Sequence, residues 1–131
     1  MKSLSSISAA ALIATASLLT GCGGGGDEAG SPTAFSVSPD TSTVTWTSVA
    51  GLACGPTLVG TFFVYGGTAP YRLDNSNPGE VTLSSPTVGQ RGGSFTASFV
   101  GGCVDPAIVT IVDSLNHVIT LKLINKAVKA T

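Results

Sequence analysis

The chain has 131 residues, of which 43% are hydrophobic and only 10% are charged, and its formal net charge is −1. This length accommodates one domain, and the slightly negative charge offers no electrostatic attraction to nucleic acid. The 17 glycines and 7 prolines supply turn residues, whereas the sequence has no long runs of the Glu, Lys, Gln and Arg residues that cover helix surfaces. Beyond the first twenty residues, the composition therefore favours a β-rich extracytoplasmic module.

The N-terminal segment has the layout of a secretory signal. Lys2 gives a short positive start, and an apolar stretch follows from Ile7 to Leu19. A membrane-spanning helix needs about twenty residues, so this stretch is too short to cross a bilayer. The G-x-G-x-x-G spacing of phosphate-binding loops also occurs, at Gly21, Gly23 and Gly26. Because no strand pattern precedes these glycines and no helix pattern follows them, a phosphate-binding loop is disfavoured.

Leu19, Thr20, Gly21 and Cys22 end this signal-like segment. The tetrapeptide closely resembles the lipobox of bacterial lipoproteins, in which an apolar residue and two small residues precede an invariant cysteine. The resemblance implies recognition of Leu19, Thr20 and Gly21 by a signal peptidase, a diacylglyceryl group on the Cys22 sulfur, and cleavage before Cys22. In that family an aspartate after the cysteine often favours retention in the inner membrane. Gly23 stands there instead, so we expect a lipid anchor in the outer membrane of the bacterial cell envelope.

The segment after Cys22 has no apolar side chain larger than alanine as far as Thr33. We expect it to form a flexible tether, which about eleven residues could extend to at most roughly 35 to 40 Å. The expected organisation is a removed signal peptide over residues 1–21, a lipidated cysteine and linker over 22–33, and one folded domain over 34–131. Contact with the membrane is expected through the lipid on Cys22.

From Phe35 onward, short stretches alternate apolar and polar residues with period two, and clusters of turn residues separate them. We expect about seven or eight strands, at Phe35–Ser38, Thr43–Thr47, Leu58–Tyr65, Tyr71–Asn75, Val81–Ser84, Ser94–Val100, Ile108–Val112 and Val118–Asn125. Leu58–Tyr65 and Ile108–Val112 are apolar on both faces, which predicts positions in the middle of a sheet. Strands of this length and spacing predict an antiparallel sandwich of two sheets.

The sequence GGTAPY, from Gly66 to Tyr71, resembles a turn found in many bacterial immunoglobulin-like domains. Its glycines permit positive φ, and Pro70 stiffens the return of the chain. We expect Tyr71 to bury its ring and to bond its hydroxyl group to nearby backbone. With the later turn sequences NSNP and GGC, the resemblance extends over residues 35–125. It implies an all-β fold, an immunoglobulin-like antiparallel β-sandwich of about seven to eight strands, preceded by the signal peptide and linker.

Two cysteines remain once Cys22 is assigned to the lipid. In an oxidising compartment Cys54 and Cys103 are expected to form a disulfide, and closing about fifty residues would stabilise the fold by about 4 kcal/mol. Metal ligation and a free reactive thiol are the alternatives. Trp46 precedes both cysteines, whereas in antibody domains a tryptophan lies between the paired cysteines.

Candidates for catalysis are few, because the chain has one histidine and neither a G-x-S-x-G nor an H-E-x-x-H motif. We expect His117 to lie in an exposed hairpin turn. A catalytic triad with Asp113 and Ser114 would draw all its members from this one turn and would leave no separate oxyanion site. The sequence therefore predicts that the protein is not an enzyme.

Two small ligand sites are alternatives. Asp105, Asp113 and Asn116 are oxygen donors at strand ends where calcium could bind, although Asx turns explain them equally well. Trp46 and Tyr65 could form a stacking platform for a sugar, although a tryptophan in an alternating strand more often belongs to the core. Three lysines give a mildly basic edge, or a solvated strand end, near the C-terminus: Lys122, Lys126 and Lys129.

The sequence thus predicts a non-enzymatic, lipid-anchored immunoglobulin-like module that acts in binding, adhesion or structural spacing. Its partner would be an unidentified envelope protein or glycan, and no cofactor, metal or nucleic acid is expected. The alternative is a ligand-binding lipoprotein with a small carbohydrate or calcium site.

Overall fold

Alternating apolar and polar residues form nine strands in a computed structural model, which describes residues 34–50 and 53–131. The expected signal peptide, the lipobox-like residues Leu19 to Cys22 and the expected linker lie outside the described residues. The strands are β1 (Ser36–Ser38), β2 (Thr41–Ser48), β3 (Thr57–Tyr65), β4 (Tyr71–Asn75), β5 (Val81–Leu83), β6 (Thr87–Val88), β7 (Ser94–Phe99), β8 (Val104–Val112) and β9 (Val118–Lys129).

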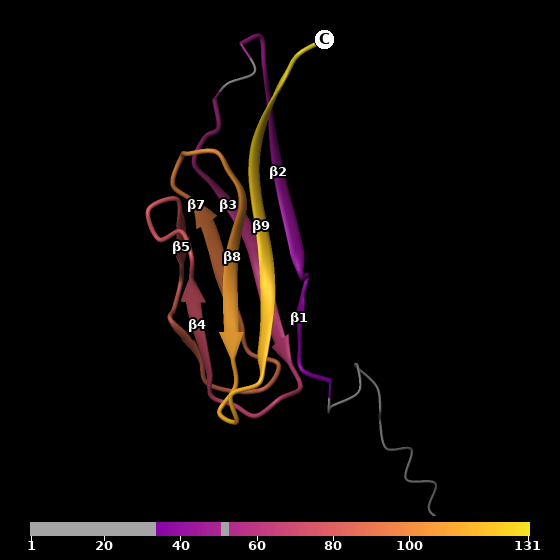
Figure 1. Cartoon of the computed structure of the whole chain (residues 1–131), viewed down its shortest axis with the longest axis vertical. Coiled ribbons are helices and arrows are strands. Elements are labelled where there is room, and N and C mark those ends of the chain that lie inside the picture. The colour runs from indigo at the N-terminus through magenta and orange to yellow at the C-terminus, as the bar shows by residue number, and fades with distance from the viewer. Residues whose placement is uncertain (1–33, 51–52) are drawn as a thin grey trace, which may run out of the picture.

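The strands pack as two layers, a four-stranded sheet in the order β1-β3-β7-β5 and a five-stranded sheet in the order β2-β9-β8-β4-β6 (Figure 1). This order is that of an immunoglobulin-like sandwich, so the predicted fold class is confirmed. The chain crosses from the first sheet to the second at Pro39 and Asp40, between β1 and β2. β2 pairs with β9 in parallel, and the other strand pairs are antiparallel.

Each of the eight predicted strands is present, and the differences are the ends of some strands and one additional strand, β6. β6 was not expected, because two residues are too few to show a period. β2 and β9 are longer than predicted, since their polar ends pair residue for residue from Thr41 opposite Lys122 to Ser48 opposite Lys129. Pairing with a neighbouring strand, rather than hydrophobic alternation, keeps Lys129 within the sheet.

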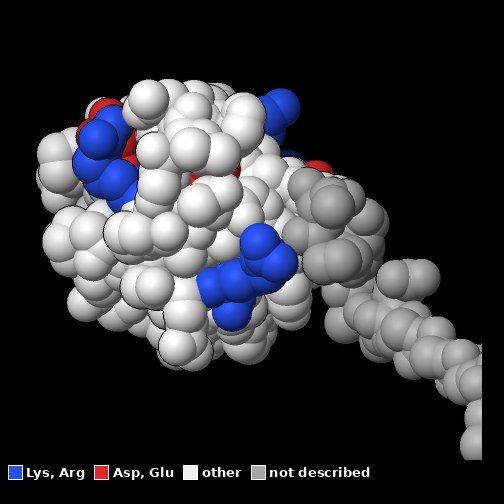
Figure 2. All heavy atoms as spheres, turned by 90° about the horizontal axis from the view of Figure 1, so that it is seen from below, with Lys and Arg blue, Asp and Glu red and all other residues white. Residues whose placement is uncertain are grey.

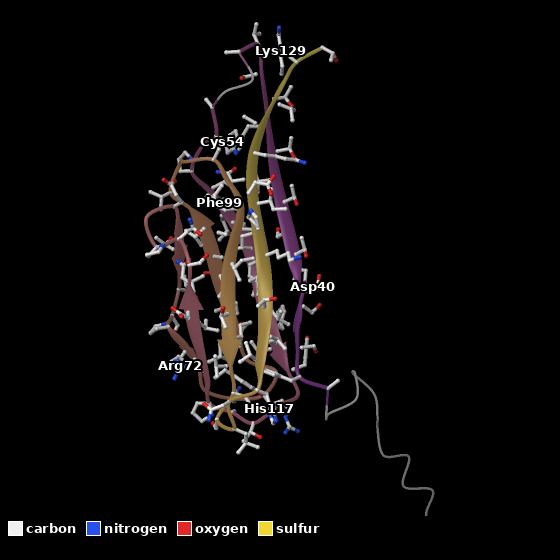
Figure 3. The ribbon with its side chains drawn as sticks, viewed as in Figure 1. Asp40, Cys54, Arg72, Phe99, His117 and Lys129 are labelled. Atoms are coloured by element: carbon white, nitrogen blue, oxygen red, sulfur yellow. A yellow bond between two sulfur atoms is a disulfide. The ribbon has the colours of Figure 1, made fainter. Side chains whose placement is uncertain are left out.

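The core lies between the two sheets, where the inward side chains of both layers meet (Figure 3 labels Phe99). Phe62 and Phe95 stack across neighbouring strands, with ring centroids 5.6 Å apart. β3 and β8 occupy middle positions in their sheets, as their apolar character predicts. The outer face of β3, however, is open to solvent, because no described element covers it. Phe63 and Tyr65 therefore remain 41% and 36% exposed.

The turn between β3 and β4 has the predicted conformation. Gly66 and Gly67 have φ angles of 63° and 60°, and a Cβ atom on Gly66 would lie 2.0 Å from the carbonyl oxygen of Ala34. Tyr71 is buried, and its hydroxyl group donates a hydrogen bond to the carbonyl oxygen of Gly66. The turn is thereby fixed against the start of the domain, and the expectation for Tyr71 is confirmed.

A disulfide joins the two sheets at the end opposite this turn. Cys54 precedes β3 and Cys103 precedes β8, and their sulfur atoms lie 1.98 Å apart. Because β3 and β8 belong to different sheets and start at the same end of the sandwich, the bond links the two sheets covalently at that end. Figure 3 shows Cys54 and His117 near opposite ends of the domain.

Candidate functional site

The hairpin between β8 and β9 is organised by one carboxylate. Asp113 follows the last residue of β8 and is 3% exposed. Its Oδ1 accepts hydrogen bonds from the backbone N–H groups of Leu115 at 2.9 Å and His117 at 2.8 Å. Its Oδ2 accepts from the backbone N–H of Thr68 at 2.9 Å and lies 3.0 Å from Nδ1 of His117. Asp113 thus ties the hairpin to the turn between β3 and β4.

These contacts set the charge of Asp113. Burial raises the pKa of its carboxyl group, but hydrogen bonds from His117, Thr68 and Leu115 outweigh this effect and lower the pKa from 3.8 to about 2. Because an ionised carboxylate can only accept hydrogen bonds, Nδ1 of His117 carries the proton that joins the pair. The imidazole itself is 66% exposed, which confirms the predicted location of His117 in an exposed hairpin turn.

An open groove of about 700 Å³ lies beside this pair at the same end of the domain. Phe35, Thr68, Arg91 and His117 contribute to its walls. Nη2 of Arg91 donates a hydrogen bond to the carbonyl oxygen of Gly67 at 3.0 Å, which holds the guanidinium group at the rim. Figure 2 views this end from below and shows a largely uncharged surface with a few Lys and Arg groups and small exposed areas of Asp and Glu. The groove therefore combines the His117 imidazole, the Arg91 guanidinium group and the buried Asp113 carboxylate with uncharged neighbours.

The triad considered from the sequence is only partly assembled. Asp113 and His117 form a pair, but the hydroxyl group of Ser114 donates to the carbonyl oxygen of Pro70 at 3.0 Å instead of to His117. A catalytic triad needs a hydroxyl group that bonds to the imidazole, and the Ser114 hydroxyl group bonds to the backbone instead.

The three oxygen donors considered for calcium do not form one site. Asp105 lies near the start of β8 and Asp113 directly after its end, so about 25 Å of strand separates them. The carboxylate oxygens of Asp113 already accept hydrogen bonds from the turn backbone. Within residues 34–50 and 53–131, no three His, Cys, Asp or Glu side chains are grouped closely enough to hold a metal ion. The hydrogen bond from the Leu115 N–H group to Oδ1 of Asp113 is that of an Asx turn, which was the alternative interpretation of this residue.

The sugar platform considered from Trp46 and Tyr65 is wrong. The Trp46 ring packs on Gly55, because a Cβ atom there would lie 2.8 Å from it. Gly55 precedes β3, whereas Tyr65 is the last residue of β3, so the two rings are separated by the length of a nine-residue strand, about 30 Å. The partner of Tyr65 is Phe63, with nearly parallel rings and centroids 6.4 Å apart.

Asn125 is a polar centre that the sequence analysis missed. Its side chain is fully buried, and its Oδ1 accepts a hydrogen bond from Nε1 of Trp46 at 2.7 Å. Its Nδ2 donates to the carbonyl oxygen of Gly102 at 2.9 Å and, more weakly, to that of Gly55 at 3.4 Å. Asn125 follows Leu121 and Leu123 at the inward positions of β9, and this register was the signal that could have revealed it.

The outer faces of the two sheets differ in charge. The β2-β9-β8-β4-β6 sheet carries charged side chains on its outer face: Arg72, Asp74, Lys122 and Lys126. The β1-β3-β7-β5 sheet has an outer face of hydroxyl-bearing and apolar side chains without a charged residue, which we call the hydroxyl–aromatic face: Ser36, Ser38, Leu58, Thr61, Phe63, Tyr65, Thr82, Ser94, Thr96 and Ser98. Lys122 and Lys126, two of the three lysines expected to form a basic edge, therefore lie on the opposite face from Phe63 and Tyr65.

In the part of the chain that the structure describes, no helix has the length and apolar character needed to cross a membrane. Comparison with models of known protein families gives no match, and comparison with curated proteins gives none either.

Proposed function

We propose that this protein is a lipid-anchored lipoprotein of the bacterial cell envelope, made of an anchor and a non-enzymatic immunoglobulin-like module for binding, adhesion or spacing.

 The observation that carries the proposal is the Leu19-Thr20-Gly21-Cys22 motif, which ends a signal-like segment and is separated by eleven residues from Ala34, the first described residue. The expected chemistry is a thioether between Cys22 and a diacylglyceryl group, followed by cleavage before Cys22.

The folded domain supports this proposal through its disulfide. Disulfides persist in oxidising compartments such as the periplasm and the cell surface, and Cys54 and Cys103 are bonded here. Cys22 is then the one cysteine left for a lipid, since the chain has 3 in total.

The arrangement of the domain is compatible with attachment at one end. The described chain begins beside β1, at the lower end in Figure 1, and the C-terminus lies at the upper end. A tether of about eleven residues reaches at most roughly 35 to 40 Å. The anchor would therefore hold the module close to the membrane while leaving both sheet faces accessible.

The contacts of the Asp113–His117 pair support a non-enzymatic role. Asp113 accepts three backbone hydrogen bonds that shape the hairpin, and Ser114 bonds to Pro70. These contacts account for the pair as a structural element of the turn.

Metabolic labelling with an alkyne fatty acid tests the anchor. In a Gram-negative host, the full chain should incorporate the label and sediment with membranes, whereas Cys22→Ser should lose both properties. Thr20→Ser keeps a small residue before the cleavage point and should behave like the original chain. Labelling of Cys22→Ser at the original level would contradict the proposal.

Density-gradient separation of the two membranes tests the location. The original chain should fractionate with the outer membrane, and Gly23→Asp should shift it toward the inner membrane. An inner-membrane location of the original chain would contradict the outer-membrane assignment while leaving the lipid anchor in place.

A further inference from the structure

Two aromatic side chains form a stripe on the outer face of β3. Phe63 and Tyr65 have ring centroids 6.4 Å apart and an interplanar angle of 22°. Phe62 and Val64 alternate with them and are buried in the core. Because a shift of one residue would move the buried pair into solvent, the register of β3 holds both rings on the outer face.

Hydroxyl groups flank this stripe on both sides. Phe63 lies between Ser38 of β1 and Ser94 of β7, and Tyr65 lies opposite Ser36. Thr61, the next outward residue of β3, lies opposite Thr96. Each Ser or Thr hydroxyl can donate one hydrogen bond and accept others. The hydroxyl–aromatic face thus places apolar rings in the middle and hydrogen-bonding groups beside them.

The charge of this face restricts the class of ligand. The hydroxyl–aromatic face has no charged residue, whereas the opposite sheet presents Arg72, Asp74, Lys122 and Lys126. Anionic lipids and nucleic acids require basic side chains for electrostatic attraction. A neutral ligand with both an apolar surface and many hydroxyl groups is the chemical complement, and a sugar ring has this combination.

We propose that the hydroxyl–aromatic face binds a neutral polysaccharide of the cell's own envelope, with Phe63 and Tyr65 against the C–H faces of sugar rings. This inference rests on the binding role and the anchor proposed above. The tether supplies the argument for the source, because about eleven residues keep the domain within roughly 35 to 40 Å of its anchor. Envelope glycans lie within that reach.

A second copy of the domain fits this face less well. Large apolar side chains on it are limited to Leu58, Phe63 and Tyr65, with hydroxyl groups around them. A stable protein interface buries about 800 Å² on each partner around an apolar core. Hydroxyl groups that bond to water in the free domain can bond to sugar hydroxyls in a complex, directly or through bridging water.

A sedimentation assay tests the proposal with the full-length lipoprotein in a detergent that contains no sugar. One arm uses the neutral polysaccharide fraction extracted from the envelope of the bacterium that encodes the chain, immobilised on beads. A second arm uses cellulose, and a third uses alginate, which is anionic. We expect retention on the envelope fraction that persists in high salt, and no retention on alginate.

Variants identify the face. Phe63→Ala combined with Tyr65→Ala should weaken binding about tenfold or more, because two ring contacts are lost. Phe63→Tyr keeps a ring and should retain binding. Val128→Ala is the matched control, since Val128 is 40% exposed on β9 of the other sheet, and it should bind like the original chain. Circular dichroism and thermal melting establish that each variant is folded.

Three outcomes would overturn the inference. They are absence of binding to the envelope fraction, unchanged binding by the folded double variant, and binding confined to cellulose or alginate. Fatty-acid labelling of the same samples separates these outcomes from failure of the proposed function, because the double variant leaves Cys22 intact. Equal retention of the matched control and loss in the double variant would support the hydroxyl–aromatic face.

Discussion

Asp113 connects two turns through a single carboxylate, and its charge is what makes these contacts favourable. Its oxygen atoms accept backbone hydrogen bonds from Thr68, Leu115 and His117, and the His117 imidazole completes the set. Hydrogen bonds to the ionised form lower a carboxyl pKa below its value in the unfolded chain, and a lowered pKa makes stability depend on pH.

The expected pH dependence follows from that shift. The pKa of Asp113 is about 2 in the folded protein and 3.8 in an unfolded chain, so its stabilising contribution is complete above about pH 4 to 5 and is lost as the pH falls toward about 2. Asp113→Asn should therefore show a smaller decrease in the free energy of unfolding across this window. Urea unfolding at a series of acidic pH values measures it.

The exposed Asp105 offers a control for this experiment. Asp105→Asn should retain the original dependence on pH, because Asp105 does not take part in the hairpin. Parallel curves for the original chain and Asp113→Asn would show that the hairpin carboxylate does not control acid stability.

β2 and β9 form a parallel pair, and the buried side-chain amide of Asn125 links them on the side that faces the core. Asn125 of β9 binds Trp46 of β2, and it also bonds to the carbonyl oxygens of Gly55 and Gly102 beside the disulfide. A buried polar group without a hydrogen-bond partner destabilises the folded state. The stability of the end of the domain near the disulfide therefore depends on Asn125, which is the partner of Trp46, Gly55 and Gly102.

Asn125→Ala should destabilise the domain by about 2 to 4 kcal/mol, because the Trp46 N–H and two carbonyl groups lose their partner. Chemical unfolding measures this change, and the fluorescence of Trp46, the sole tryptophan, should report greater access of water to its ring. Thr45 lies at an exposed position of β2, next to Trp46, and Thr45→Ala should change the free energy of unfolding by less than about 0.5 kcal/mol. Equal effects of the two substitutions would contradict a special role for the amide.

The disulfide acts on the whole domain because it closes a segment of 49 residues across the two sheets. In the chain-entropy model, a loop of that length contributes about 4 kcal/mol by restricting the unfolded chain. The Cys54→Ala, Cys103→Ala double variant should therefore unfold at a markedly lower denaturant concentration. Reduction of the original chain should reproduce this loss, whereas the double variant should not respond to reductant. A reductant-independent midpoint in the original chain would contradict the assignment.

The sequence predicted the fold well because most strands carry their own pattern. Alternation marked the strand that contains Phe95 and Phe99, and the glycines before Tyr71 marked a turn whose φ angles are positive. β6 and the end of β9 were not predictable in this way, since they exist through pairing with β4 and β2. Local sequence carries no direct record of such pairing.

The candidate sites were predicted less well for the same reason. The proximity of Asp113 and His117 is local and could be read from their spacing, but the distance between Trp46 and Tyr65 depends on how the sheets are assembled. The flanking of Phe63 by Ser38 and Ser94 likewise joins residues far apart in the chain. A surface formed by side chains from several strands can be predicted only when the register between those strands is known.

The position of the disulfide also determines how the domain would respond to mechanical load. A pull on the chain at residue 34 travels through β1 and β2 before it reaches Cys54. There the covalent bond to Cys103 bypasses the chain between the two cysteines, which are 49 positions apart, so tension cannot lengthen that part of the chain. β3, with Phe63 and Tyr65, lies inside the bypassed segment. Tension between residue 34 and the C-terminus would therefore act along β1, β2, β8 and β9, while the strand that carries the aromatic stripe keeps its length.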